Sequence, residues 1–355
     1  MSQPQPLEAV FKLERSLGAS WPSIRAAHDA TVMLHERLGQ ALDQFTSEDT
    51  SVVIFGSAAR FEVTSQSDTD WLYLVDGQAD PRHRDSAIGV TREIEKIGNE
   101  PGPEGTFGTL ASSHDLVQFI GGRDDTNANL TRRILLLLES RPIGRREAYD
   151  RVVRAVLDRY LSGDHGWISG HAPYGIPRFL QNDIARYWRT VAVDFAYKQW
   201  TRNNEGWALR SAKLRMSRKL TYAAGLLYCF HLATAERNAP LPSRESLHKH
   251  QGIDALSDLT HRTPLDILAQ AFLSSESLHE YAKRAFDAYD RFLGLLNLEE
   301  DRTHLKTLRP EDADGDRRYQ LVRNIGEEFQ AGLTHLFLEN TATQYPALIK
   351  AYGVF

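Results

Sequence analysis

The chain has 355 residues, of which 41% are hydrophobic and 25% charged, and its formal net charge is −5. This length accommodates two domains of ordinary size, and the composition is typical of a globular protein rather than a disordered or fibrous one. The negative charge excludes an overall electrostatic attraction to nucleic acid or to anionic lipid. No apolar run could span a bilayer, the first residues lack a signal-peptide pattern, and a lone cysteine, Cys229, excludes an intrachain disulfide. We therefore expect a cytoplasmic protein.

The pattern of the first 45 residues predicts helices. Residues 1–18 are polar and mixed, so we expect a short helix on an unfixed end of the chain. The tetrapeptide S-W-P-S at 20–23 is typical of a helix start, because proline suits the first turn. We expect the helix that follows to run to about residue 45 and to cover one face of a sheet with its apolar stripe.

The stretch 52–76 has the pattern of a strand, a glycine turn, a polar connector and a second strand. Its first apolar run ends at Gly56 and Ser57, and the second run opens with Asp68 and Asp70. Side chains two residues apart on a strand point to the same face, so we expect these two carboxylates to project side by side. Two acids at the end of a buried strand are costly unless a cation neutralises them, and a divalent cation such as Mg²⁺ prefers oxygen ligands. The alternative is a pair of loop acids beside a glycine turn.

The next segment alternates between helical and extended patterns. We expect a helix over 86–97, a glycine- and proline-rich loop over 98–108, and strands over 109–120. Asp115 begins the alternating part of that last segment. Gly121 and Gly122 then turn the chain into a long helix that ends near residue 140, with polar residues able to cap its start.

Helical periodicity dominates the second half. We expect helices over 147–161, 177–201, 207–235, 264–296 and 316–351. The predicted fold class is therefore α+β: a small mixed β-sheet with flanking helices, followed by an α-helical bundle. We divide the chain into a first domain over 1–140, which carries the paired acids, a boundary region over 141–176, and a helical domain over 177–355.

A basic segment at 206–220 is the second feature that points to function. It carries five cations: Arg210, Lys213, Arg215, Arg218 and Lys219. Positions 210, 213 and 217 or 218 share one face of a helix. Such a face could bind phosphate groups, or it could be a solvated surface. Polar residues on the preceding helix could line a cleft together with this face, or they could pair with each other: Arg178, Asp183, Arg186, Tyr187 and Arg189.

The glycine turn and the paired acids resemble the signature of the DNA polymerase β-type nucleotidyltransferase superfamily. The matching residues are Gly56, Ser57, Asp68 and Asp70, and Arg60, Glu62, Thr64 and Ser67 also stand where bacterial members have them. The layout is similar to that of the nitrogen-regulatory-protein uridylyltransferases and of related bacterial nucleotidyltransferase-domain proteins. Residues 206–210 form a degenerate version of their Gly-Leu-Arg motif. The sequence has no HD phosphohydrolase motif and no ligand-sensing domain, which argues for a stand-alone transferase.

The resemblance implies transfer of a nucleoside monophosphate from an NTP to a hydroxyl acceptor, with Mg²⁺ or Mn²⁺ as cofactor. The residues implied as catalytic and metal-binding are Asp68, Asp70 and a third carboxylate, for which we favour Asp115 over Glu104 and Asp76. The residues implied in nucleotide binding are Gly56, Ser57, Arg60, Arg210 and Lys213. In a two-metal reaction, one cation activates the attacking hydroxyl and the other holds the triphosphate.

Three alternatives remain at this level. Arg60 either orients a phosphate or forms a salt bridge that steadies the connector. The acceptor is a protein, an RNA or a small molecule, and the size of the helical domain favours the first two. Finally, the chain could be a non-catalytic module that binds a nucleotide or a partner. A site that had lost its activity, however, would have no chemical reason to keep paired acids.

Overall fold

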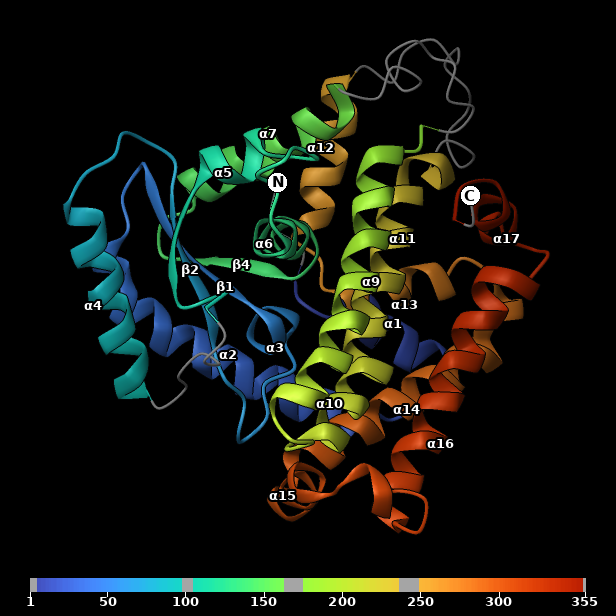
Figure 1. Cartoon of the computed structure of the whole chain (residues 1–355). Coiled ribbons are helices and arrows are strands. Elements are labelled where there is room, and N and C mark those ends of the chain that lie inside the picture. The colour runs from blue at the N-terminus through green and yellow to red at the C-terminus, as the bar shows by residue number, and fades with distance from the viewer. Residues whose placement is uncertain (1–4, 98–104, 163–174, 236–248, 354–355) are drawn as a thin grey trace.

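The computed structural model describes residues 5–97, 105–162, 175–235 and 249–353. It has the expected α+β class, with a small mixed sheet and many helices (Figure 1). The sheet stands at the left of Figure 1, and most helices of the second half of the chain lie to its right. The strands are β1 (Thr50–Phe55), β2 (Asp70–Val75), β3 (Thr109–Ser112) and β4 (Ser140–Ile143).

The strand order is β3-β2-β1-β4. β1 is antiparallel to both β2 and β4, and β2 is parallel to β3. All six residues of β1 are buried, as its run of β-branched and aromatic side chains predicts. Phe55, the last residue of β1, pairs with Asp70 on one side and with Ser140 on the other. The start of β2 and the start of β4 therefore meet at the end of β1 where the glycine turn begins.

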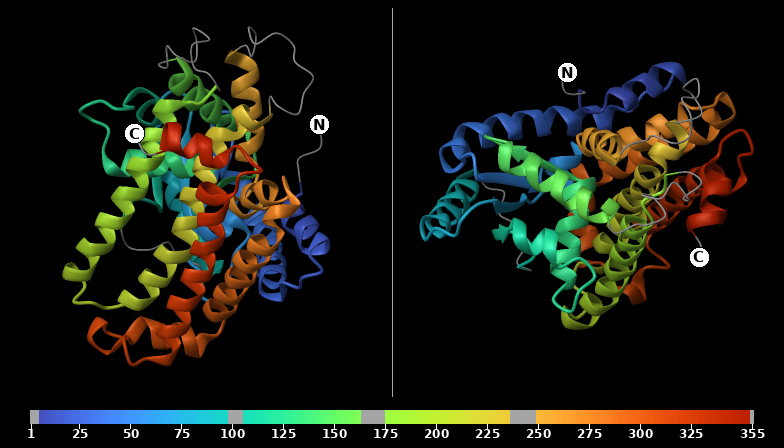
Figure 2. Two further views of the ribbon diagram at one scale, coloured as in Figure 1. Left: turned by 90° about the vertical axis from the view of Figure 1, so that its right-hand side faces the viewer. Right: turned by 90° about the horizontal axis from the view of Figure 1, so that it is seen from above.

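The two faces of the sheet pack against different helices. On one face, Ile54, Trp71 and Tyr73 form a core with residues of α2 (Pro22–Leu42) and α4 (Arg82–Ile97). On the other face, Phe55 and Leu72 join a core that continues through the helical half of the chain. The sheet and the bundle therefore share one continuous hydrophobic interior. Figure 2 shows the helical half against the sheet from two further directions.

The remaining helices form the rest of the molecule. Before residue 176 they are α3 (Gly56–Arg60), α5 (Ser113–Gln118), α6 (Asn127–Leu138) and α7 (Glu147–Ser162). After it they are α9 (Arg178–Thr201), α10 (Trp207–Lys213), α11 (Lys219–Ala235), α12 (Lys249–Thr260), α13 (Pro264–Phe272), α14 (His279–Asn297), α15 (Glu299–Thr307), α16 (Arg317–Thr334) and α17 (Tyr345–Leu348). None of the helices in the described ranges is long and apolar enough to cross a membrane.

The segment 109–120 differs from the expected strands. It is a strand only as far as Ser112, and α5 begins at the next residue. The Ser112 hydroxyl accepts a hydrogen bond from the backbone N–H of His114, which caps the helix and ends the strand. Asp115 therefore lies in the first turn of a helix, and the prediction that it starts a strand is wrong. A strand also appears in the expected boundary region, where β4 completes the sheet.

The N-terminal segment is not an unfixed end. Leu7, Val10 and Leu13 are fully buried, and α1 (Glu8–Ser16) packs against α13. The Asp266 carboxylate in α13 accepts hydrogen bonds from the backbone N–H groups of Leu7 (2.8 Å) and Ala9 (3.0 Å). The expectation failed because the acceptor for these N–H groups lies more than 250 residues downstream.

Candidate functional site

The glycine turn joins the end of β1 to the short helix α3. Gly56 has φ +64°, a conformation that side chains other than glycine's rarely adopt. A Cβ atom there would also come within 3.3 Å of the Asp70 carboxylate oxygen Oδ2. The backbone turn therefore favours glycine, and the absence of a Cβ atom also leaves room for the acid at the start of β2.

The two acids lie on the other side of this turn. Asp70 is the first residue of β2, and Asp68 stands in the connector two residues before it, so the strand begins slightly later than expected. Burial, and then the charge of Asp68, raise the pKa of Asp70 to about 6. Lys213 and Arg218 act in the opposite direction. Within the described ranges, neither acid forms a hydrogen bond or an ion pair with another side chain. The pair is therefore only partly neutralised.

Two cavities meet at these acids, and both are lined by Asp68, Asp70, Lys213 and Arg218. The smaller one, about 70 Å³, also contains Gly56 and Ser57, and we call it the glycine pocket. The larger one, about 360 Å³, lies between the end of the sheet and helices α6, α9 and α10, and we call it the wide cleft. The structure thus brings together seven of the eight predicted site residues: Gly56, Ser57, Arg60, Asp68, Asp70, Arg210 and Lys213.

Only part of the basic segment faces the acids. Arg210, Lys213 and Arg218 line the wide cleft, whereas Arg215 and Lys219 line a surface depression beside α16. A π-helical turn at Leu214–Arg218 separates α10 from α11. Because a π turn contains an extra residue, it keeps Arg218 on the same side as Lys213 although the two are five positions apart. Such turns occur frequently at functional sites.

Arg60 belongs to a buried ion network behind the acids. Its Nε donates to Glu62 (2.7 Å), and its Nη1 donates to Glu139 (2.9 Å). Arg218 pairs with the other oxygen of Glu139 (3.2 Å), and the Tyr289 hydroxyl donates to Glu62 (2.8 Å). Two arginines and two glutamates thus compensate each other. The salt-bridge alternative for Arg60 matches this geometry, and Arg60 still forms part of the wall of the glycine pocket.

Asp115 does not join the pair. It lines neither cavity, and it acts electrostatically on Arg132, whose Nε donates to the Thr106 carbonyl (2.7 Å). Extending the β2–β3 register places Phe107, not an acid, beside Asp70, and Phe107 lines the wide cleft. Asp76 is bound to Arg151 (2.7 Å), and Glu104 lies outside the described residues. In the described ranges, no group of three or more His, Cys, Asp or Glu residues is arranged to hold a metal ion.

The pair itself has features that a divalent cation requires. Two carboxylates line one pocket beside a glycine, and among the described residues no cationic side chain forms an ion pair with either of them. Magnesium is commonly bound through one or two carboxylates, with substrate phosphates and water completing its ligands. Asp68 and Asp70 therefore fit such an ion when a phosphate ligand is present.

Several cleft residues could not be found from local motifs. Arg302 in α15 donates to the Thr64 hydroxyl (3.1 Å) and to the Gln66 carbonyl, and it lines the glycine pocket. Lys198 of α9 and Arg202, which caps the end of that helix, line the wide cleft. No spacing rule connects these residues to the hairpin, because they are more than 120 positions away and only packing brings them near it.

Comparison with known proteins adds no further residues. The chain matches no family model, and no curated protein is similar to it in sequence. We therefore interpret the cleft from its own side chains and their geometry.

Proposed function

We propose that this protein is a metal-dependent nucleotidyltransferase, which transfers a nucleoside monophosphate from an NTP to a hydroxyl acceptor and releases pyrophosphate. The observation that supports this most strongly is the partly neutralised pair Asp68 and Asp70 in a cleft with Lys213 and Arg218. Acids alone would repel a triphosphate, and cations alone would not hold a metal ion. Their combination in one cleft suits a metal–triphosphate complex.

Each residue of the two cavities has a distinct part in the proposed reaction. The acceptor oxygen attacks the α-phosphorus, the bond from that phosphorus to the bridging oxygen breaks, and pyrophosphate leaves with the electron pair. Asp68 and Asp70 would hold Mg²⁺ or Mn²⁺, which lowers the pKa of the attacking hydroxyl and offsets charge on the phosphates. Ser57 donates its hydroxyl to a phosphate oxygen, and Gly56 lets the backbone approach closely. Lys213 and Arg218 stabilise the charge that develops on the leaving pyrophosphate.

Ligand-dependent stabilisation tests the binding step without turnover. We expect the melting temperature to rise when an NTP and Mg²⁺ are added together, because a ligand that binds only the folded state stabilises it. We expect Asp68→Asn and Asp70→Asn to lose this shift and to reduce pyrophosphate release by at least a hundredfold. If no NTP gives metal-dependent binding or pyrophosphate release, the chain is a non-catalytic module and the proposal is wrong.

The basic segment offers a matched pair of variants. Lys213→Ala should raise the apparent KM for NTP about tenfold or more, because it removes a cation from the wall that both cavities share. Arg215→Ala removes a cation two residues away that faces α16 instead, and it should leave KM unchanged. If the two changes have equal effects on KM, the basic segment is a solvated surface and does not bind the NTP.

A further inference from the structure

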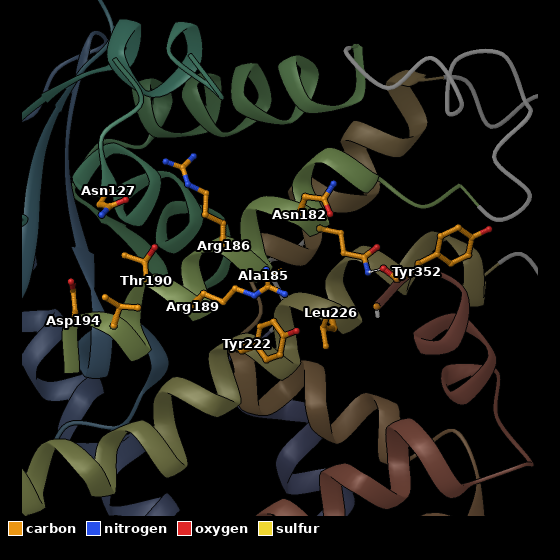
Figure 3. A pocket seen from close by; sticks show the side chains of 13 residues that line it. Asn127, Asn182, Ala185, Arg186, Arg189, Thr190, Asp194, Tyr222, Leu226 and Tyr352 are labelled. Carbon is orange, nitrogen blue, oxygen red and sulfur yellow. Dashed lines mark hydrogen bonds between the residues drawn. The ribbon is translucent and has the colours of Figure 1, made fainter. Parts of the chain in front are cut away.

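A third cavity also borders α9, and the proposed reaction does not use it. It measures about 550 Å³ and lies between α9, α11 and the C-terminal turn that contains Tyr352 (Figure 3). We call it the α9 pocket. This volume lies within the range of about 300–1,000 Å³ that small-molecule sites occupy. The Gln181 side chain closes one end by donating to the Tyr352 carbonyl (2.5 Å).

Two arginines on neighbouring turns of α9 line the pocket. Arg186 is held in place by Asp125, which accepts from its Nη1 (2.9 Å), while the Asp125 carbonyl accepts from its Nη2 (3.1 Å). The fully buried Arg133 pairs with both Asp125 and Asp183, and Asp183 also lies 3.8 Å from Arg186, so these two acids balance Arg133 and Arg186. Arg189 has no carboxylate partner among the described residues. Arg189 is therefore the guanidinium that the pocket offers to an anionic ligand.

Aromatic and amide groups also line the pocket. Figure 3 shows Arg189 extending toward Tyr222 of α11, while Arg186 points away toward the start of α6. The Tyr222 ring stacks on Trp188, with centroids 5.4 Å apart and planes inclined by 16°, so it is held rigidly. Asn182 and Thr190 add hydrogen-bonding groups on the same helix. Guanidinium groups with adjacent neutral donors suit a carboxylate or a phosphate.

The α9 pocket adjoins the wide cleft at a single residue, Asp194, which lines both. Asp194 is five residues beyond Arg189, about 7.5 Å further along the helix axis. A small molecule whose acidic group contacts Arg189 can therefore direct its other end toward the cleft. The wide cleft, at about 360 Å³, has room for one nucleotide, so an acceptor needs space of its own.

We propose that the α9 pocket binds a small molecule that carries a carboxylate or phosphate group and a hydroxyl, and that this molecule is the acceptor. Arg189 binds the acidic group, and Asp194 accepts a hydrogen bond from the hydroxyl at the mouth of the cleft. The hydroxyl oxygen then forms the bond to the α-phosphorus, pyrophosphate leaves, and the hydroxyl proton passes to solvent. The binding site stands on geometry alone, whereas the acceptor role rests on the proposed function.

Calorimetric titration with inorganic phosphate tests the site without any turnover. We expect Arg189→Ala to weaken one phosphate site at least tenfold, and Arg189→Lys to restore part of the affinity. Lys213→Ala, which alters the wide cleft, should leave that site intact. Arg92→Ala removes an exposed arginine on α4 and controls for the loss of a positive charge. If Arg189→Ala binds phosphate as the unaltered protein does, the site is overturned, whatever the outcome for NTP binding.

Fractionation of a cell extract tests the acceptor role. The extract is divided by mass and then by anion exchange, and each fraction is incubated with the protein, Mg²⁺ and NTPs labelled at the α-phosphate. We expect a new labelled product only from the low-mass anionic fraction, and we expect Arg189→Ala to reduce it. A product from the macromolecular or neutral fractions would overturn the acceptor assignment. Absence of product from every fraction would overturn the proposed function and the acceptor role with it, while the phosphate titration would still decide the binding site.

Discussion

Asp70 illustrates how burial and a neighbouring like charge act on one carboxylate. Its carboxylate is held against Gly56 and beside Asp68, where burial and a like charge favour the protonated form. A folded-state pKa of about 6 lies above the ordinary value of 3.8. Between these two values the unfolded chain ionises first, so stability is lost as pH rises through this window. At neutral pH the ionised carboxylate therefore destabilises the protein without its cation.

The variant Asp70→Asn should separate stability from activity. We expect its melting temperature at pH 7 to exceed that of the unaltered protein, because the destabilising charge is gone, while pyrophosphate release is lost. The difference should shrink toward pH 4, where Asp70 is protonated in the folded state. Thermal unfolding across this pH range measures it. A variant that is less stable at pH 7 would show that Asp70 is already neutralised by its neighbours.

Asp115 provides a second test at the level of single residues. Its place in the first turn of α5, outside both cavities, removes the geometric reason for a role in metal binding. We expect Asp115→Asn to keep pyrophosphate release within about twofold of the unaltered protein, with only a small loss of helix stability. A loss as large as that of Asp68→Asn would restore the assignment made from sequence.

The buried ion network links three elements: α3 and its connector, the end of α6, and the π-helical turn before α11. Its two glutamates are not equivalent. Burial raises the pKa of Glu62, although Arg60 opposes this. Burial also acts on Glu139, but Arg60 and Arg218 outweigh it and lower its pKa. Glu139 is therefore the ionised centre that links the connector after β1 to the bundle.

Exchange of each glutamate for glutamine should expose this difference. Glu139→Gln leaves the buried Arg60 and the partly buried Arg218 without their shared anion, and removal of one partner from a buried ion pair costs about 3–5 kcal/mol. Glu62→Gln should cost less, because Glu62 is held nearer to its neutral form. Urea unfolding measures both variants. Equal losses would mean that the two arginines are compensated equally by both glutamates.

For the whole molecule, the division at residues 141–176 does not separate two independent interiors. The core that contains Phe55 and Leu72 also contains Leu7, Val10 and the apolar residues of the bundle. β4, which follows the expected end of the first domain, pairs with β1. The hairpin of β1 and β2 therefore packs against helices from both ends of the chain.

The docking of α1 onto α13 gives a prediction at this scale. Asp266→Ala removes the acceptor for the backbone N–H groups of Leu7 and Ala9, which are buried. Buried donors left without partners cost about 1–3 kcal/mol, so we expect a loss of this size and faster proteolysis within the first 20 residues. Asp85→Ala, at an exposed acid on α4, is the control. An unchanged unfolding curve for Asp266→Ala would mean that apolar packing alone holds α1.

Local sequence determined the elements whose pattern is short in range. The apolar run before Gly56, the spacing of Asp68 and Asp70, and the periodicity of the long helices each reflect backbone geometry over a few residues. They predicted the α+β class, the hairpin and most helices. The strand assigned to Asp115 failed because one serine cap competed with an alternating pattern, and such a cap is decided by a single hydrogen bond.

Tertiary packing alone decided which charges face the acids. Five cations in one basic segment look alike in sequence, but the π-helical turn directs Lys213 and Arg218 to the cleft and Arg215 to the opposite side. Arg302, Lys198 and Arg202 reach the site from distant positions in the sequence. Asp266, in the second half of the chain, likewise fixes the N-terminal segment. Contacts of this kind depend on how whole helices pack, and no pattern confined to neighbouring residues encodes that.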